Sequence, residues 1–253
     1  MTPTVYLVSG ANRGLGLGLV RTLAARPNTI VFAGARNPST ATELQTLASE
    51  QPGKVNPVKL VAADKPGNEA AVEEIKAKAG RLDVVIANAG IFQDYCSAIK
   101  ATADQLREHL EVNTIGPFVL YQACFDLLKA STPNPKFVAI SSGLGSIAEG
   151  ARREGVLAYG LSKAAQNYLT RKLHFEHEKD GLIAFSICPG GVESEMSLKA
   201  VLAQGATVEM ARASGKLKSP EFTAWYILQR IDEATREKHS GEWISFDGKR
   251  KTW

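Results

Sequence analysis

The sequence predicts an α/β fold in which a doubly wound sheet of about seven parallel strands has helices on both faces. Short β-rich apolar runs alternate with helical patterns, and runs such as "VVIANAG" and "KFVAIS" are apolar without alternation. Continuous apolar strands suit a parallel sheet that is covered on both faces, and the strand–helix order builds right-handed βαβ units. With 253 residues, 44% of them hydrophobic, the chain fits one Rossmann-type domain over residues 1–253.

Seven strands are expected where apolar runs are bounded by turn residues. They are Thr4–Ser9, Thr29–Gly34, Pro57–Ala62, Asp83–Ala87, Lys136–Ser141, Leu182–Cys188 and Glu242–Phe246. The expected helices are Gly14–Ala25, Thr40–Glu50, Asn68–Ala79, Asp104–Ala130, Ala158–Lys179 and Pro220–Lys238. Ligands of such sheets bind outside the carboxyl ends of the strands, so functional residues are expected in the segments that follow each strand.

Several classes of protein are not expected from this sequence. The first residues, "MTPTVYLVSGANRG", lack a basic start and a long apolar run, so no signal sequence is expected. No stretch approaches the ~18 apolar residues of a membrane span. Cys96, Cys124 and Cys188 form no CxxC motif and are expected to be reduced thiols in a cytoplasmic protein. His174 and His177 share a helix without an evident third ligand, so no metal site is expected.

The net charge of +4 is concentrated in residues 1–42. This segment contains Arg13, Arg21, Arg26 and Arg36 and no Asp or Glu, whereas the rest of the chain is balanced. A nucleic-acid-binding protein usually shows a broader basic stripe, so no nucleic-acid partner is expected. The local surplus of charge therefore needs another explanation.

A glycine-rich turn follows the first strand. The segment "SGANRGLGLG" places Gly10, Gly14 and Gly16 in a GxxxGxG pattern between a strand and a helix. Glycines there allow a tight turn and a close approach of the backbone to a pyrophosphate, and the helix start offers free N–H groups to phosphates. The pattern predicts a dinucleotide site. The other residues of this turn assigned to it are Asn12, Arg13 and Leu15.

The arginines of the first segment indicate the type of dinucleotide. Sites that prefer NAD usually place an Asp or Glu near the end of the second strand, but "TIVFAGARNP" has no acid before Glu43. Arg36 stands where that carboxylate would be, and Arg13 lies in the glycine turn. Two guanidinium groups can hold a 2′-phosphate through charge-assisted hydrogen bonds, so the predicted cofactor is NADP(H). Two solvated arginines without a ligand are the alternative.

The segment "YGLSK" places Tyr159 four residues before Lys163. On a helix this spacing brings both side chains to one face, about one turn apart. A nearby cation favours phenolate and is expected to lower the pKa of Tyr159 from its reference value of about 10, which would suit acid–base catalysis. A packed tyrosine beside a solvated lysine is the alternative.

The order of these motifs resembles that of the short-chain dehydrogenase/reductase family. The motifs are the three glycines, "NAG" at 88–90, "ISS" at 140–142, "YGLSK" and "PGGV" at 189–192, and together they span almost the whole chain. The segments "GANRG", "SSGLGSI" and "SFDGKRKTW" are most similar to its carbonyl-reductase-like branch. That branch includes sniffer-type enzymes and fungal polyketide ketoreductases such as those acting on norsolorinic acid.

The resemblance implies NADPH-dependent reduction of a ketone or aldehyde by hydride transfer. It implies that Tyr159 is the general acid and that Lys163 lowers the pKa of the phenol and binds the nicotinamide ribose. The family's SSxxG pattern selects Ser142 as the hydroxyl that orients the carbonyl, with Ser146 as the competing candidate. Asn113 would distort its helix and hold a water that leads to Lys163.

The resemblance also implies further contacts with the cofactor. Asp64 would bond the adenine amine, and Ser194 keeps a hydroxyl where relatives commonly carry Thr. Gly191 stands where close relatives often have Trp, a departure expected to enlarge the active site or free the loop. The remaining contacts are Asn88, Ala89 and Gly90 beneath the adenine ribose, and Pro189, Gly190 and Val192 near the nicotinamide carboxamide.

The substrate wall is expected to combine apolar and polar segments, which favours a sizeable, partly apolar carbonyl compound. It draws on Ile91, Phe92, Tyr95 and Leu144 and on loops at about 143–157 and 191–219. A homo-oligomer is compatible with these expectations. Two alternatives remain: a catalytically silent NADP(H)-sensing regulator of the same fold, and a nucleic-acid binder that uses the basic first segment. The complete set of acid–base residues argues against the silent regulator, which needs no proton relay.

Overall fold

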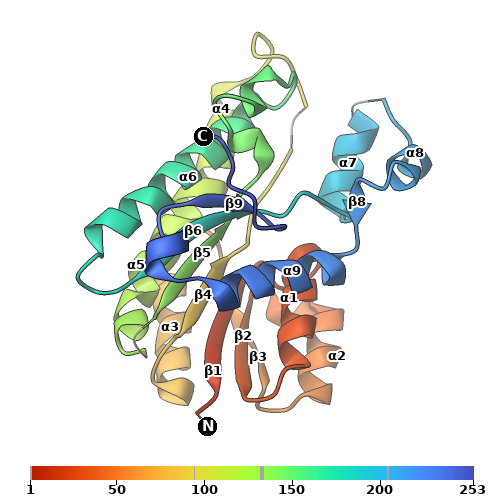
Figure 1. The fold of residues 1–253 in the computed structure, drawn as a ribbon. Helices are drawn as coiled ribbons and strands as arrows, with labels where there is room; N and C mark the ends of the chain where they lie inside the picture. The colour runs from red at the N-terminus through yellow and green to blue at the C-terminus, as the bar shows by residue number, and fades with distance from the viewer. Residues whose placement is uncertain (1, 94, 132–133, 204) are drawn as a thin grey trace.

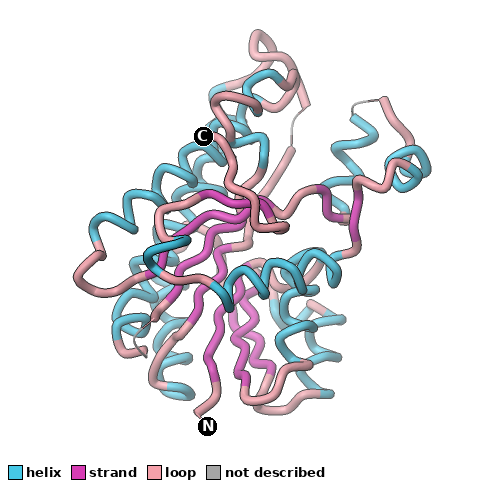
Figure 2. Tube along the Cα trace, viewed as in Figure 1, coloured by secondary structure: helices cyan, strands magenta, loops and turns pink. Residues whose placement is uncertain are grey.

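The computed structural model describes residues 2–93, 95–131, 134–203 and 205–253 and confirms the doubly wound α/β fold. A seven-stranded parallel sheet in the order β3-β2-β1-β4-β5-β6-β9 lies between two layers of helices (Figures 1 and 2). The strands are β1 (Thr4–Ser9), β2 (Thr29–Ala35), β3 (Val55–Lys59), β4 (Val84–Ala87), β5 (Lys136–Ile140), β6 (Ile183–Cys188) and β9 (Trp243–Ser245). The strand order reverses beside β1, and a crevice forms at such a point.

Two separate cores explain why the strands read as continuous apolar runs. On β1, Tyr6 and Val8 pack into the core on one face of the sheet, whereas Val5 and Leu7 pack into the core on the other face. The first face is covered by α1 (Gly14–Ala24), α2 (Thr42–Glu50) and α9 (Pro220–Glu233). The second is covered by α3 (Lys65–Ala79), α5 (Gly116–Lys129) and α6 (Leu157–Glu176) (Figure 1).

The third strand lies earlier than predicted. The expected range was Pro57–Ala62, but β3 is Val55–Lys59, and Pro57 pairs with Ala33 within it. An edge strand tolerates proline inside it, and β3 is the edge of the sheet.

The long predicted helix Asp104–Ala130 is interrupted. The chain forms α4 (Ala103–Leu110), then a π-helical turn at Glu111–Ile115, and then α5. π-Helical turns are rare in proteins, and those that occur are often found at functional sites. The predicted helix Pro220–Lys238 is also divided, because Thr235 caps a new short helix, α10 (Arg236–His239), after α9. Short 3₁₀ turns occur at Pro38–Thr40, Gly143–Gly145 and Gly150–Arg152.

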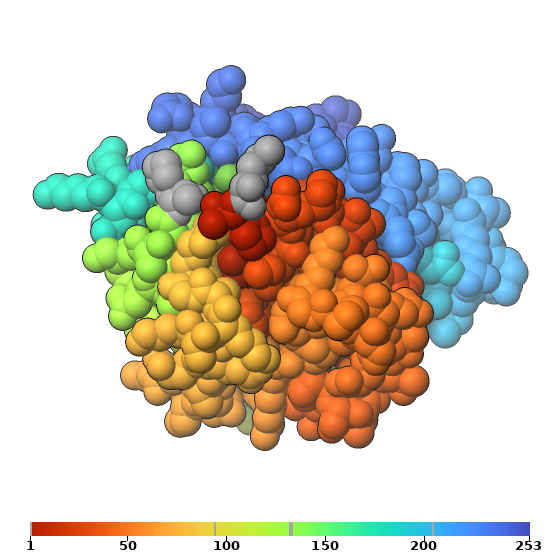
Figure 3. Space-filling view, turned by 90° about the horizontal axis from the view of Figure 1, so that it is seen from below, coloured from red at the N-terminus to blue at the C-terminus, as the bar shows by residue number. Residues whose placement is uncertain are grey.

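The segment expected as the second substrate loop contains helices that were not predicted. It forms β7 (Gly191–Val192), α7 (Glu195–Ala203), α8 (Val208–Ala213) and β8 (Leu217–Lys218), while its residue 204 lies outside the described residues. It projects from the body near the carboxyl ends of the strands, and the projection is also visible from below (Figures 1 and 3).

Gly191 has a structural role in this projection. It pairs with Leu217 between β7 and β8, and a Cβ on it would lie 2.5 Å from the carbonyl oxygen of Lys216. The expectation that Gly191 frees the loop is therefore wrong, because the residue belongs to a close strand pair that only glycine fits. None of the described helices is both long and apolar enough to cross a membrane.

Candidate active site

The glycine turn between β1 and α1 is packed so closely that side chains would not fit. A Cβ on Gly10 would lie 2.8 Å from Ala89 Cα, and one on Gly16 would lie 2.1 Å from the carbonyl oxygen of Gly10. Gly10 also has a φ of 65°, in the left-handed region that favours glycine. No side chain caps the start of α1, so its N–H groups are available to a phosphate.

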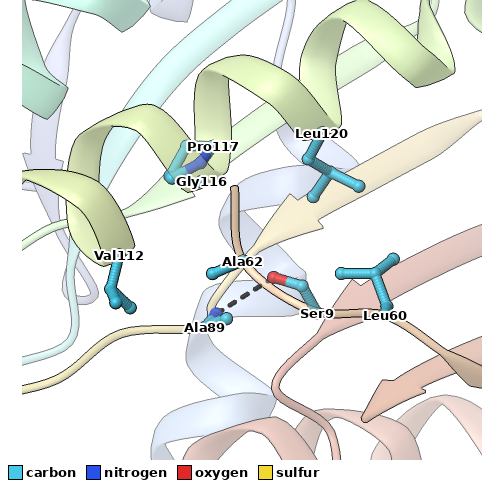
Figure 4. A pocket seen from close by; sticks show the side chains of 8 residues that line it. All are labelled: Ser9, Leu60, Ala62, Ala89, Val112, Gly116, Pro117 and Leu120. Carbon is cyan, nitrogen blue, oxygen red and sulfur yellow. Dashed lines mark hydrogen bonds between the residues drawn. The ribbon is translucent and has the colours of Figure 1, made fainter. Parts of the chain in front are cut away.

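Asn88 and Ser9 hold this turn against the end of β4. The Asn88 amide donates to the carbonyl oxygens of Ser9 (2.9 Å) and Gly10 (3.2 Å), and Ser9 Oγ accepts from Asn88 N–H (3.0 Å). Ser9 Oγ also accepts from Ala89 N–H (3.0 Å; Figure 4). The side chain of Asn88 thus holds the glycine turn in place against the end of β4. A small hollow beside it is lined by Ser9, Leu60, Ala62, Ala89, Val112, Gly116, Pro117 and Leu120 (Figure 4).

A larger open hollow of ≈ 460 Å³ lies beyond the end of β2. Its lining residues are Asn12, Arg36, Asn37, Thr40, Ala41, Lys59 and Val61, none of them acidic. Lys59 was missed in the sequence because the third strand was placed too late. In the structure it ends β3 directly opposite Ala35, so the register brings a second cation beside Arg36. The hollow can therefore hold an anionic group.

Two predicted cofactor residues are engaged elsewhere. The guanidinium of Arg13 forms an ion pair with Glu195 at the start of α7 (2.5 Å) and does not line the hollow around Arg36. The carboxylate of Asp64, expected at the adenine amine, accepts a hydrogen bond from Gly67 N–H (3.2 Å) and caps α3. Both side chains were assigned from their positions in the chain, which did not reveal these partners.

The loop after β6 meets the glycine turn. Gly190 has a φ of 69°, and a Cβ on Gly14 would lie 3.4 Å from Ser194 Cβ. Val192 is buried. The expected nicotinamide side of the crevice thus lies next to its expected phosphate side.

Lys163 is a buried cation at the carboxyl end of β5. It is 3% exposed, and its Nζ donates to the carbonyl oxygen of Ile140 (2.8 Å) and to Gln166 Oε1 (2.9 Å). Burial disfavours the charged form and lowers the pKa of Lys163 to about 7. This lysine can therefore change its charge near neutral pH.

Tyr159 lies on the same helix, half-buried under an aromatic ring. Its ring stacks on Phe92, with centroids 4.1 Å apart and planes inclined by 16°, and the side chain of Ser142 lies near its hydroxyl. Burial of the hydroxyl away from water raises the pKa of Tyr159 to about 12. The nearby Ser142 side chain has a smaller effect that lowers this pKa. The expected lowering by Lys163 is not found in this structure. The ammonium lies 5.9 Å from the ring centroid, and desolvation has the larger effect.

Three serines near Tyr159 have different partners. Ser141 Oγ is buried and donates to Asn167 Oδ1 (2.6 Å). Ser146 Oγ donates to the carbonyl oxygen of Thr252 (2.7 Å) and accepts from Glu149 N–H. Ser142 Oγ accepts from Leu144 N–H (3.2 Å) and, of the three serines, is the one that acts on the pKa of Tyr159.

A glycine brings the serine loop onto α6. A Cβ on Gly145 would lie 2.9 Å from both the carbonyl carbon and the Cβ of Lys163. Close approach at this point places Ser142 beside Tyr159. The SSxxG spacing thus has a physical cause in the packing of the loop on the helix.

Asn113 lies in the π-helical turn, so the distortion that the resemblance implied is present. Its Oδ1 accepts from Ile91 N–H (2.8 Å), and its Nδ2 donates to the Ile91 carbonyl oxygen (2.9 Å) and to Ser162 Oγ (3.0 Å). The side chain connects the end of β4 to α6, and both of its N–H groups are used in doing so, while Oδ1 keeps one further acceptor position.

The two helical histidines lie in other hydrogen-bond networks. His174 Nδ1 bonds Ser240 Oγ (2.8 Å), and His177 bonds Tyr121 and Asp180. No group of three or more His, Cys, Asp or Glu residues within the described ranges could hold a metal ion.

The site combines a glycine turn, a basic hollow and a serine–tyrosine–lysine cluster, which follow the carboxyl ends of β1, β2 and β5. Residues 4–205 match the family model of the short chain dehydrogenases. The protein therefore belongs to the short-chain dehydrogenase family and is an oxidoreductase of that kind.

Individual proteins are similar along nearly the whole chain. The norsolorinic acid ketoreductase of Aspergillus parasiticus is 37% identical over 259 residues, covering 99% of this chain and 91% of that protein. The short chain dehydrogenase gsfK of Penicillium aethiopicum is 36% identical over 255 residues, covering 99% and 100%. The NADPH-bound carbonyl reductase from chicken fatty liver has a TM-score of 0.88 at 30% identity, with 100% of both chains covered.

Ser142→Ala is expected to reduce turnover far more than Ser146→Ala, because the Ser142 side chain acts on Tyr159 whereas Ser146 Oγ donates to Thr252. Loss of one hydrogen bond of ~1.5–3 kcal/mol to a developing charge corresponds to about tenfold or more in kcat. Steady-state kinetics of both purified variants measures this. A larger loss of kcat in Ser146→Ala would contradict the assignment.

Proposed function

We propose that this protein reduces a ketone or aldehyde to an alcohol with NADPH. The observation that carries the proposal is the placement of the Ser142 side chain near the hydroxyl of Tyr159, on the helix that holds the buried ammonium of Lys163. This arrangement offers two donors to one carbonyl oxygen at the edge of a dinucleotide-type crevice. The names of the similar ketoreductases and carbonyl reductases support the same class of reaction.

The residues of the crevice fit a nicotinamide dinucleotide. The glycine turn has no room for side chains, and the uncapped start of α1 can bind the pyrophosphate. Arg36 and Lys59 would hold a 2′-phosphate, with Thr40 as a neutral donor in the same hollow. When bound, the nicotinamide ring supplies the hydride. The lysine replaces Arg13, which the sequence had suggested as the second cation.

The raised pKa of Tyr159 suits the direction of reduction. A phenol with a pKa of about 12 stays protonated at neutral pH and can give its proton to the oxygen of the carbonyl as that oxygen becomes negative. Ser142 orients the same oxygen, and Lys163 stabilises the phenolate that remains. Asn113 fixes the end of β4 against α6. A silent sensor of NADP(H) would need none of these donors.

The substrate is proposed to be a sizeable, partly apolar carbonyl compound. Phe92 packs between the rings of Tyr159 and Tyr95, with centroid distances of 4.1 Å and 4.4 Å. Leu144 and the projecting α7 would complete the wall. Aromatic rings next to the phenol would bind a flat apolar group well. The described cysteines are all free thiols, which agrees with the proposal of a cytoplasmic protein.

Tyr159→Phe is expected to lower the rate of carbonyl reduction by orders of magnitude while NADPH binding stays largely intact. The ring that stacks on Phe92 remains, but the proton donor is removed. Tyr168→Phe is the matched control, since this tyrosine is exposed on the same helix. NADPH oxidation with a panel of aromatic ketones, quinones and aldehydes measures the rate. Turnover of Tyr159→Phe close to that of the wild type would sink the proposal.

Arg36→Ala and Lys59→Ala are each expected to weaken NADPH binding by about tenfold or more and to change NADH binding little. Each removes a charge-assisted hydrogen bond worth ~1.5–3 kcal/mol to a phosphate that NADH lacks. Arg21→Ala is the control, because Arg21 pairs with Glu43 and Glu221 outside the hollow. Titrations followed by tryptophan fluorescence give the Kd values. Equal loss for both cofactors would refute the phosphate site.

A further inference from the structure

Gln166 is a buried amide that contacts the proposed catalytic lysine. It lies three residues after Lys163 on α6, is 0% exposed, and accepts a hydrogen bond from Lys163 Nζ at 2.9 Å. Its Nε2 is buried and has no partner among the described residues. An ammonium group can only donate, so the amide oxygen must face Lys163 even though the nitrogen is left unpaired. The amide orientation is therefore set by the lysine.

Within the described parts of the chain, Lys163 has two hydrogen-bond acceptors, which leaves one N–H of its ammonium group unused. Lys163 Nζ has three N–H donors, and two of them are directed at the Ile140 carbonyl oxygen and at Gln166 Oε1. On another side lies Gly90, where a Cβ would be 3.7 Å from Nζ. Gly90 is the last residue of the "NAG" motif, which follows β4 at the carboxyl end of the sheet. The third N–H thus remains for a group in the crevice.

We propose that Gln166 is a positioning residue that keeps the buried Lys163 ammonium charged and directs its free N–H into the crevice. Its catalytic consequence rests on the proposed function, but its effect on Lys163 does not. A buried charge needs hydrogen-bond acceptors in place of water. Gln166 supplies one of the two acceptors that Lys163 Nζ has among the described residues.

The ammonium group of Lys163 is stabilised by neutral oxygen atoms, because no carboxylate of the described residues acts on it. The titratable groups that face it are the Cys188 thiol on β6 and the Tyr159 phenol on α6. Burial has the larger effect and lowers the pKa of Lys163 to about 7. The charge of Cys188 acts in the opposite direction and would raise that pKa. No carboxylate of the described residues contributes to that pKa. Removal of the Gln166 oxygen should therefore lower the pKa further.

The neighbouring Asn167 offers a matched control. It is 1% exposed, and its Nδ2 is likewise buried without a partner among the described residues. Its oxygen accepts from Ser141 Oγ (2.6 Å) and not from Lys163. Asn167→Leu thus removes a buried amide of the same helix while the acceptors of Lys163 remain.

The test follows the ¹⁵Nζ resonance of Lys163 against pH in the full-length, cofactor-free protein labelled with ¹⁵N-lysine. Its signal is assigned by its absence in Lys163→Met. Gln166→Leu is expected to lower the Lys163 pKa by about one or more, since a charged hydrogen bond of ~1.5–3 kcal/mol is lost. Asn167→Leu should leave it within a few tenths of the wild-type value. An unchanged midpoint in Gln166→Leu, or equal shifts in both variants, would overturn the proposal.

Gln166→Glu decides the question if the leucine variant does not fold. It keeps an acceptor of similar size and adds a negative charge, so the Lys163 pKa should rise above that of the wild type. An unchanged or lowered pKa would overturn the proposal. These titrations need neither substrate nor NADPH. A wild-type protein that reduces no carbonyl compound would refute the proposed function and leave the role of Gln166 standing.

Discussion

The buried ammonium of Lys163 is the constraint around which the site is built. A cation that is 3% exposed requires acceptors, and the chain supplies the Ile140 carbonyl oxygen from β5 and Gln166 from its own helix. The bond to Ile140 joins α6 to the carboxyl end of β5, whereas the bond to Gln166 lies within the helix. Gly145 then lets the serine loop pack on α6 at Lys163 itself. The position of Ser142 beside Tyr159 follows from this packing.

Burial changes the two titrating groups in opposite directions. It raises the pKa of Tyr159 to about 12 and lowers that of Lys163 to about 7, because both neutral forms are favoured away from water. The phenol of Tyr159 therefore stays protonated at neutral pH, whereas Lys163 gains or loses its charge near neutral pH. A positive nicotinamide ring would favour the phenolate, so the pKa of Tyr159 should differ between the free and cofactor-bound protein.

Much of the fold could be predicted because local pattern and global topology agree. The parallel strands read as apolar runs since each is covered on both faces, as β1 shows. The glycine turn was recognisable because only glycine fits where Gly10 and Gly16 pack. The catalytic candidates also follow from spacing, since Tyr159 and Lys163 share one face of a helix.

Some features could not be predicted from the sequence, because they depend on contacts between distant residues or on the register of a strand. Arg13 pairs with Glu195, which is 182 positions away, and spacing carries no information on such a contact. Lys59 entered the basic hollow through the register of an edge strand that contains a proline. Gln166 lies one turn from Lys163, yet a glutamine at that spacing is usually a solvated residue. Only its burial identifies it.

The pH dependence of stability tests the burial of Lys163 most directly. The folded pKa of about 7 lies below the ordinary value of 10.5, so between these values the unfolded chain binds more protons and folding stability rises with pH. Urea unfolding of the wild type and of Lys163→Met across pH 6 to 10 isolates this contribution. The account predicts that the wild type gains stability relative to Lys163→Met above about pH 7, by at most ~1.4 kcal/mol for each pH unit. Parallel profiles for the two proteins would show that Lys163 is not held in a desolvated site and would contradict the account.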